Sequence, residues 1–277
     1  MTSDPTERGP RRRDPIRWRR AGARALALLT LVLASLAWAA LDRGLDAADR
    51  TRAYAEAGLP ERPSAWTIVR GRIAGPPRVA IQVGHLRAAE HPDELAALRV
   101  STGATVGALR EVDLNHAVAE ALARRLANAG IDVTLLPATV PPGLRADVLL
   151  AVHADASVEP DRRGYKSAHA VPSRNGREPL LKAAVDAAYL HASGLPDDHA
   201  NVTGAMLDYY AFADHRLRHA AHRGTAGLIV ELGYLSHPLD RAWLADPDRA
   251  ADALADGLLR YLAGLDRWHP ALAARVP

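Results

Sequence analysis

The sequence predicts an α/β protein built on an open, mostly parallel β-sheet with helices on both faces, preceded by an N-terminal membrane helix or signal segment. Short, wholly apolar runs such as residues 148–152 and 227–230 are typical of strands buried on both faces. Amphipathic helical stretches alternate with these runs, as they do in parallel sheets. The N-terminal prediction rests on residues 25–41, an uncharged apolar stretch that follows an arginine-rich tail.

The N-terminal stretch has the features of an export segment. As a helix with a rise of 1.5 Å per residue, residues 25–41 would span roughly 25 Å, the short end of the range for a membrane helix. The excess of arginine in residues 1–24 would hold that end in the cytoplasm and place everything after Asp42 outside. The sequence Ala-Trp-Ala at 37–39 also fits a signal-peptide cleavage site, and a buried helix of a soluble protein is a third interpretation. We therefore expect a membrane protein with an extracytoplasmic catalytic domain, or a secreted one if the segment is cleaved.

The charge distribution and the lack of cysteine exclude several classes of function. The whole chain carries a formal net charge of +3, but the arginines of residues 1–24 account for more than that, so the rest is not basic. A nucleic-acid-binding domain needs positive charge on the folded body, and we predict no nucleic-acid partner. The chain has no cysteine. This excludes disulfides, cysteine-ligated zinc and a thiol nucleophile.

The chain divides into five predicted segments, with prolines and glycines marking the linker before the compact domain. They are a basic cytoplasmic tail at 1–24, a transmembrane anchor or signal segment at 25–41, a stalk and linker at 42–77, the catalytic domain at 78–268, and a tail at 269–277.

Within residues 78–268 the periodicity predicts alternating strands and helices. The predicted strands are 79–83, 131–136, 148–152, 165–171 and 227–230, and the predicted helices are 113–129, 178–192 and 247–262. Gly130 and Gly264 stand where two of the helices should end.

Three predicted strands end in an ionisable residue beside a small one, at His85, His153 and Glu231. The carboxyl ends of parallel strands line the ligand crevice of open α/β sheets, so these side chains should converge. A fourth candidate, Glu111, stands just before the helix at 113–129. Two imidazoles and one carboxylate, with a position left for water, form a catalytic zinc site, and the remaining glutamate would serve as general base. Each residue by itself has an ordinary structural explanation, so the prediction rests on their combination.

Other polar groups have simpler interpretations. His116 and Glu120 are four residues apart, as in an exposed pair on a helix. Tyr209 and Tyr210 are expected either to line a sugar- or peptide-binding wall or to pack in the core. The histidines near the C-terminal third are expected to form a polar patch and not a second metal site; they are His215, His219 and His222.

The motifs around these residues resemble the zinc-dependent N-acetylmuramoyl-L-alanine amidases, a peptidoglycan amidase family with an open α/β fold. The matching stretches are Val-Ala-Ile-Gln-Val-Gly-His at 79–85, Gly-Ala-Leu-Arg-Glu-Val-Asp-Leu-Asn at 107–115, Ala-Asp-Val-Leu-Leu-Ala-Val-His-Ala-Asp at 146–155 and Ala-Gly-Leu-Ile-Val-Glu-Leu-Gly-Tyr-Leu-Ser at 226–236. The resemblance implies that His85, Glu111 and His153 bind Zn²⁺ and that Glu231 is the catalytic carboxylate. It also implies that residues 78–268 are a zinc amidase domain.

The sequence departs from the family pattern in three places. Leu86 and Arg87 stand where the family has glycines, residues 86–101 form an apparent insertion that could cover the cleft, and Asp155 replaces the customary asparagine. The expected activity is hydrolysis of the amide between N-acetylmuramic acid and L-alanine, with peptidoglycan as substrate and the membrane as a further partner through the N-terminal helix. A zinc peptidase or other amidase on the same scaffold, and a non-catalytic wall-binding module, are the alternatives. The sequence leaves the need for a protein activator open.

Overall fold

The computed structural model describes residues 75–265 of the chain. The predicted segments 1–24, 25–41 and 269–277, and nearly all of 42–77, lie outside the described residues. Within the described range, none of the helices combines the length and apolar character needed to cross a membrane. The anchor and the export of the domain therefore stay predictions from sequence.

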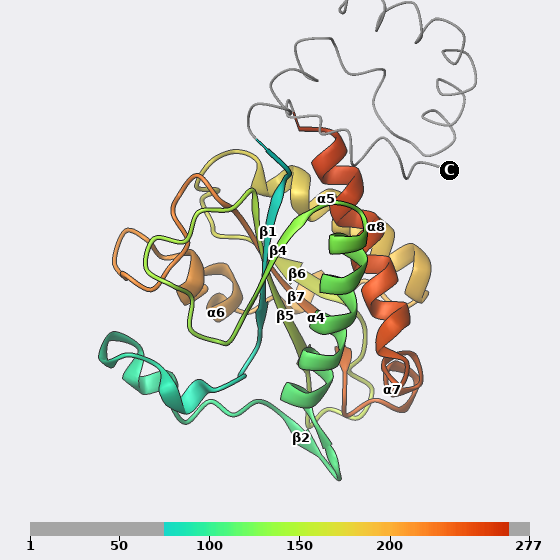
Figure 1. Ribbon diagram of the computed structural model, residues 1–277. Helices are drawn as coiled ribbons and strands as arrows, with labels where there is room; N and C mark the ends of the chain where they lie inside the picture. The colour runs from blue at the N-terminus through green and yellow to red at the C-terminus, as the bar shows by residue number, and fades with distance from the viewer. Residues whose placement is uncertain (1–74, 266–277) are drawn as a thin grey trace, which may run out of the picture. The chain divides into compact units, whose positions relative to one another are not determined.

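A five-stranded sheet in the order β4-β1-β5-β7-β6 forms the centre of the fold (Figure 1). The four strands β4, β1, β5 and β7 run parallel, and β6 is an antiparallel edge strand beside β7. The sheet strands are β1 (Arg78–Val83), β4 (Asp132–Leu136), β5 (Val148–Asp155), β6 (Lys166–Ala168) and β7 (Ala226–Tyr234); β2 (Thr105–Val106) and β3 (Leu109–Arg110) form a separate hairpin. The predicted mostly parallel sheet is confirmed, because every predicted strand has its counterpart in it.

The helices also follow the predicted pattern, with small shifts at their ends. The long ones are α4 (Glu111–Asn128), α5 (Glu178–Ser193) and α8 (Pro247–Ala263), and the shorter elements are α6 (Gly204–Leu207), α7 (Pro238–Leu244), η1 (Ala88–Glu90), η2 (Asp93–Leu98), η3 (His199–Asn201) and η4 (Tyr210–Phe212). Helix α4 begins two residues earlier than predicted, which makes Glu111 its first residue. Each of α5 and α8 has a proline in its first turn, where a missing N–H costs nothing.

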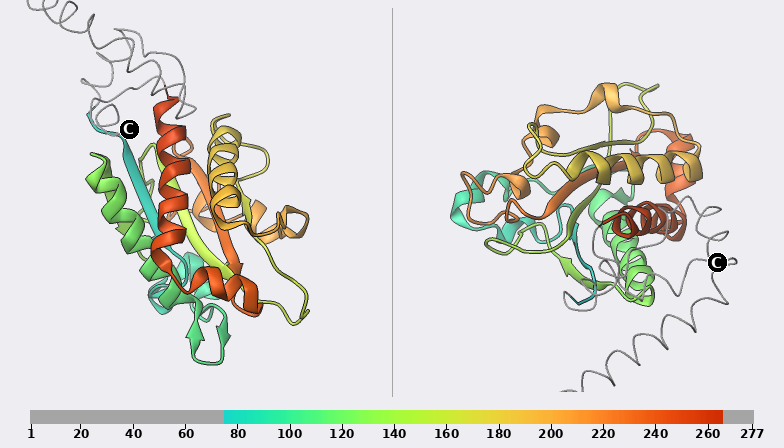
Figure 2. Two further views of the ribbon diagram at one scale, coloured as in Figure 1. Left: turned by 90° about the vertical axis from the view of Figure 1, so that its right-hand side faces the viewer. Right: turned by 90° about the horizontal axis from the view of Figure 1, so that it is seen from above.

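One face of the sheet is covered by the three long helices. Side chains of β1, β5 and β7 that point to this face pack with α4, α5 and α8 in the main hydrophobic core. Helix α8 lies between α4 and α5 and contacts both (Figure 2, left view). Its leucines Leu254, Leu258 and Leu262 are inaccessible to solvent. At roughly 1.5–3 kcal/mol for each fully buried leucine, this contact contributes substantially to the stability of the fold.

The other face is covered by connecting segments and not by long helices. The short elements α6 and η4 and the loop after β4 pack on it, forming a second and smaller core. Small residues on this face allow the close approach: a Cβ added at Gly227 would lie 2.6 Å from ring atoms of Phe212. The prediction of helices on both faces is therefore confirmed for one face, whereas the other face is covered by short elements and loops. The loop-covered face is the one that carries the polar residues described below.

A polar cluster ties α5 to the edge strand. Asp186 accepts hydrogen bonds from Tyr165 (2.9 Å) and Ser167 (2.5 Å), and its other oxygen lies 3.1 Å from Nε2 of His199. Burial raises the pKa of Asp186, but the hydrogen bonds from His199, Lys182 and Ser167 outweigh it and lower the pKa overall. The hydrogen bond to Asp186 raises the pKa of His199 in turn. The cluster therefore favours a charged pair at mildly acidic pH.

Candidate metal centre

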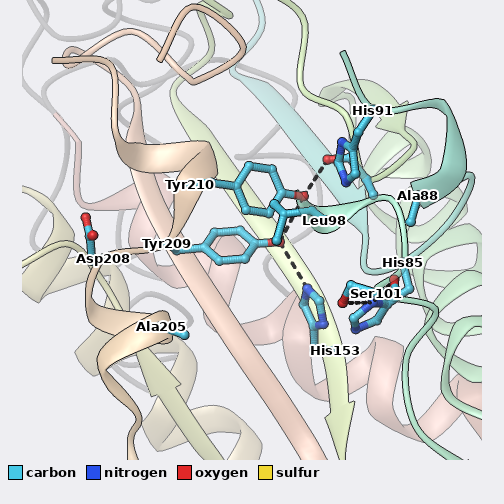
Figure 3. Close-up of a pocket in the computed structure, with 11 residues that line it drawn as sticks. His85, Ala88, His91, Leu98, Ser101, His153, Ala205, Asp208, Tyr209 and Tyr210 are labelled. Atoms are coloured by element: carbon cyan, nitrogen blue, oxygen red, sulfur yellow. Dashed lines mark hydrogen bonds between the residues drawn. The ribbon is translucent and has the colours of Figure 1, made fainter. Parts of the chain in front are cut away.

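His85 stands at the carboxyl end of β1, in a backbone conformation that few non-glycine residues adopt. Its φ is 64°, in the left-handed region, where histidine is more frequent than most side chains and which is found often at functional sites. This conformation turns the imidazole toward α4, with Nε2 lying 3.2 Å from Oε1 of Glu111. The other ring nitrogen, Nδ1, lies 2.8 Å from the carbonyl oxygen of Ser101 (Figure 3). If Nδ1 donates to that carbonyl, the lone pair of Nε2 is free to bind a metal.

His153 lies on β5, on the loop-covered face of the sheet. Its Nδ1 is 3.1 Å from Oε1 of Glu111, and its Nε2 is 3.1 Å from the hydroxyl of Tyr209. That hydroxyl donates to Oε1 of Gln82 at 3.0 Å, so its oxygen accepts from Nε2–H of His153. The hydrogen-bond pattern thus assigns the proton to Nε2 and leaves the lone pair of Nδ1 facing Glu111. Both imidazoles therefore direct an unprotonated nitrogen to the same place.

Glu111 brings a carboxylate between the two rings. As the first residue of α4 it lies at the positive end of the helix dipole. The backbone N–H of Ala104 donates to Oε2 at 2.8 Å, and Nδ2 of Asn115, one turn later, donates to Oε1 at 3.1 Å. Burial raises the pKa of Glu111, but when the facing imidazole nitrogens carry protons in place of a metal ion, the hydrogen bonds and charges of His153 and His85 outweigh burial and hold that pKa far below its usual range. Burial lowers the pKa of His85, but the hydrogen bond and charge of Glu111 and the Ser101 carbonyl raise it overall.

Two glycines make room for these ligands. A Cβ added at Gly84 would lie 2.5–2.7 Å from three ring atoms of His153, closer than real Cβ contacts allow. Gly103 has a φ of +82°, and a Cβ there would lie 3.0 Å from both Glu111 Oε2 and a ring carbon of His85. Gly84 and Gly103 must therefore be small, because ligand side chains from other parts of the chain lie directly against them.

The three donor groups lie close enough together to share one metal ion. The nearest ligand atoms of His85, Glu111 and His153 all lie within 4.8 Å of one another. In a tetrahedral zinc site with ligand bonds of about 2.0–2.1 Å, neighbouring donor atoms are about 3.3 Å apart. The observed nitrogen–oxygen separations of 3.2 and 3.1 Å are close to that value. Within residues 75–265, this is the sole group of three or more such side chains placed to hold a metal ion.

Glu231 lies beside the metal centre on β7, where the register pairs it with His153 on β5. Neighbouring strands are about 4.8 Å apart, and both side chains point to the loop-covered face. Its Oε2 is buried and, among the described residues, has no hydrogen-bond partner. Burial raises the pKa of Glu231 well above its ordinary value, and the charges of Glu111 and Asp155 add to the effect while Lys166 opposes it. A half-buried carboxyl with an unpaired oxygen beside a metal centre can accept and return a proton.

Beyond Glu231, a buried ion pair explains one departure from the family pattern. Nζ of Lys166, on β6 and in register with Glu231, donates to Oδ2 of Asp155 at 2.6 Å and to the hydroxyl of Tyr234 at 2.7 Å. Tyr234 in turn donates to Asp198 at 2.6 Å. A buried lysine needs a carboxylate partner, so an aspartate at 155 provides a charge that an asparagine would not.

The structure thus brings together all four residues that the sequence singled out, and it adds others that sequence reasoning did not. Three further residues orient the ligands, directly or through Tyr209: Gln82, Ser101 and Asn115. Of these, only Asn115 stands at a spacing, four residues after Glu111, that could have indicated its contact from the sequence. Tyr209 packs in the smaller core, one of the two interpretations offered for it, and its hydroxyl also contacts His153.

The four other histidines that the sequence singled out are not part of this centre. His116 and Glu120 form an exposed pair with a separation of 3.5 Å, as the sequence predicted. Nδ1 of His219 is 2.6 Å from Glu94, which belongs to the inserted segment 86–101. His222 contacts Arg145 at 3.4 Å. Neither they nor His215 contribute to a metal-binding group within the described part of the chain.

A cavity of about 280 Å³ opens directly beside the two histidine ligands (Figure 3). One wall is formed by the apparent insertion 86–101, and the opposite wall by residues 205–210, which run from α6 to the start of η4. The lining residues are His85, Ala88, His91, Leu98, Ser101, Ala138, His153, Ala205, Asp208, Tyr209 and Tyr210. The cavity leaves room for a small molecular group next to the two histidines.

The fold is an open, mostly parallel sheet that brings two imidazoles and a carboxylate together near the carboxyl ends of its strands. Solved structures of N-acetylmuramoyl-L-alanine amidases share this fold. Ami1 from Mycobacterium smegmatis matches with a TM-score of 0.50 and 15% identity, covering 68% of this chain and 98% of that chain. The catalytic domain of CwlV from Bacillus (Paenibacillus) polymyxa var. colistinus (TM-score 0.47, 21% identity) covers 67% and 98%, and AmiC2 of Nostoc punctiforme (0.47, 20%) covers 68% and 98%. No family model and no curated protein matches the sequence.

Proposed function

We propose that this chain is a zinc-dependent N-acetylmuramoyl-L-alanine amidase that hydrolyses the amide between N-acetylmuramic acid and the L-alanine of peptidoglycan stem peptides. The observation that carries the proposal is the convergence of His85, Glu111 and His153 beside the unpaired carboxyl of Glu231. The fold shared with Ami1 and the four sequence motifs support the choice of this amide among the possible substrates.

The protein's own residues account for the parts of such a hydrolysis. His85, Glu111 and His153 would hold the zinc ion, which when bound polarises a carbonyl and lowers the pKa of water. The carbonyl of Ser101 and the hydroxyl of Tyr209 keep the two imidazoles turned toward the metal centre. Glu231 accepts a proton from the attacking water at its free carboxylate oxygen and delivers it to the leaving amine.

The test is mass spectrometry of the products after the purified full-length protein, loaded with zinc, is incubated with peptidoglycan. The proposal expects intact stem peptides with a free L-alanine amine and unsubstituted muramic acid. Shortened stem peptides would assign the site to a peptidase. Stoichiometric zinc with no cleavage of either kind would refute the proposed substrate, and neither zinc nor cleavage would favour a non-catalytic wall-binding module.

Two variants test the assigned roles separately. Replacing His153 by alanine is expected to abolish both zinc binding and cleavage, because it removes one of three ligands. Replacing Glu231 by alanine is expected to leave one zinc per chain but remove most of the activity. Stoichiometric zinc in the first variant, or near-normal turnover in the second, would contradict the assignment.

The proposal also includes export of the domain. Peptidoglycan lies outside the cytoplasmic membrane, and residues 25–41 have the composition of an anchor or signal segment. A reporter that is active only outside the cytoplasm, fused after residue 277, should be active. N-terminal sequencing of the mature protein would distinguish an anchor from a cleaved signal.

A further inference from the structure

The cavity beside the metal centre has walls that the fold holds in place. Within the inserted segment 86–101, Glu94 accepts hydrogen bonds from the backbone N–H groups of Arg218 (3.1 Å) and His219 (2.7 Å). Nδ1 of His91 lies 2.9 Å from the hydroxyl of Thr139. Leu95 is buried, which gives the segment an apolar anchor as well. The insertion is therefore a fixed wall of a preformed cavity.

The chemistry of the walls selects a neutral group. None of the lining residues is a lysine or an arginine, and the one carboxylate among them, Asp208, is exposed at the rim. The remaining surface is formed by aliphatic side chains such as Leu98 and by the rings of Tyr209 and Tyr210 (Figure 3). Apart from the metal centre and the histidines beside it, an acidic ligand would find no cationic side chain in the walls, whereas a neutral group with apolar faces and a few polar atoms would suit them.

The two sides of the proposed scissile amide differ in charge. The stem peptide on the amine side carries carboxylates, whereas the muramoyl group on the acyl side is a neutral N-acetylated sugar with a lactyl methyl group. The position of Glu231 points the same way: it does not line the cavity, and the leaving amine must reach Glu231 for its proton. The amine side is therefore expected outside the cavity.

We infer that this cavity is the subsite for the acyl side of the substrate, and that the inserted segment 86–101 together with residues 205–210 gives this protein its selectivity for an N-acetylmuramoyl group. The inference rests on the proposed function for the identity of the amide. A volume of about 280 Å³ is near the lower end of ligand pockets, about 300 Å³, and suits a single sugar-sized group.

The experiment blocks the cavity without touching the metal ligands. Ala205 is exposed on α6 at the cavity wall, and Ala205→Trp would place an indole there. Leu207, 39% exposed on the same short helix, does not line the cavity, so Leu207→Trp is the matched control. Zinc content and thermal unfolding of the full-length variants verify that both are folded and loaded.

Two probes report on the two sides of the amide. Calorimetry on the zinc-loaded protein measures binding of N-acetylmuramic acid methyl ester, which has no free carboxylate to bind a metal, and of the dipeptide L-Ala-γ-D-Glu. We expect Ala205→Trp to weaken the sugar ester at least about tenfold, while the dipeptide stays within about twofold and Leu207→Trp changes neither.

Other outcomes would overturn the inference. Loss of dipeptide affinity with an unchanged sugar ester would place the amine side in the cavity. Equal affinities in all three proteins, or no binding of the ester to the wild type, would show that the cavity is not this subsite. The proposed activity fails independently: a wild-type protein that binds the ester but releases no stem peptide from peptidoglycan would refute the amidase and leave the subsite standing.

Discussion

The hydroxyl of Tyr209 is the partner that fixes the protonation of His153, so its removal is expected to weaken zinc binding. Tyr209→Phe keeps the ring, which packs against Phe212 with centroids 5.3 Å apart, and deletes only the oxygen 3.1 Å from Nε2 of His153. Nε2–H and the acceptor Oε1 of Gln82 would then both be left without this partner in a buried site. Loss of an outer-shell partner typically costs 10–100-fold in metal affinity. This corresponds to about 1.4–2.7 kcal/mol.

The neighbouring Tyr210 provides a closely matched control. Its hydroxyl donates to the carbonyl of Ala138 at 2.7 Å and accepts from Gln82 at 2.8 Å, but it does not contact His153. Both phenylalanine variants should lose some stability of the metal-free protein, since each leaves buried polar groups unpaired. Only Tyr209→Phe should raise the zinc dissociation constant, measured by competition with a chelating indicator at fixed pH. Zinc affinities of the two variants that agree within about twofold would refute the orienting role of Tyr209.

Three further predictions concern the same site and the edge of the sheet. Gly84→Ala should abolish zinc binding with the fold retained in circular dichroism, because the new Cβ would overlap the ring of His153. Glu231→Gln should bind zinc with unchanged stoichiometry and lower turnover by about 10²–10⁴-fold, the usual contribution of general acid–base catalysis. His199→Gln should destabilise the protein more at pH 5.5 than at pH 8 in urea unfolding. The raised pKa of His199 contributes stability that is present below the ordinary pKa of 6.5 and is lost as the pH rises through the pKa of the folded protein. The lowered pKa of Asp186 keeps this carboxylate charged at both pH 5.5 and pH 8, so its contribution to stability is lost only at more acidic pH.

Each of these has a control or a contrary outcome. Gly204→Ala, at a position with nothing within 4 Å of the added Cβ, should leave zinc binding unchanged. Turnover of Glu231→Gln within about tenfold of the wild type would remove it from the proton transfer. A destabilisation by His199→Gln that is equal at both pH values would show that the side chain acts by packing and not by charge.

Local patterns predicted the elements and the candidate ligands. The apolar runs of β1, β5 and β7 have no alternation, since strands buried on both faces need none, and their ends were marked by an ionisable residue beside a small one. Helices α5 and α8 were predicted from their periodicity, and the structure shows that each also has a proline in its first turn and that α8 has an aspartate at its N-cap. His85, Glu111, His153 and Glu231 were therefore identifiable before their arrangement was known.

The sequence did not determine which layer covers each face. The prediction of helices on both faces follows from the usual parallel sheet, yet α4, α5 and α8 all pack on one face. The opposite face carries Ala80, Ala151 and Gly227, whose small size lets segments without regular structure pack closely. Which face is covered by helices depends on the side chains that meet between the layers. The periodicity of a single segment does not show this.

Tertiary structure alone decided how the site works. The carbonyl of Ser101, 16 residues from His85, and the hydroxyl of Tyr209, 56 residues from His153, set the protonation of the two ligands. The cavity wall formed by residues 86–101 likewise depends on the hydrogen bond from the backbone N–H of His219 to Glu94, which is 125 residues away in the sequence. The sequence by itself determined the strands, the helices and the donor atoms, because these depend on composition and short-range spacing. The orientation of the donors and the shape of the cavity depend on distant segments that meet only when the sheet has formed.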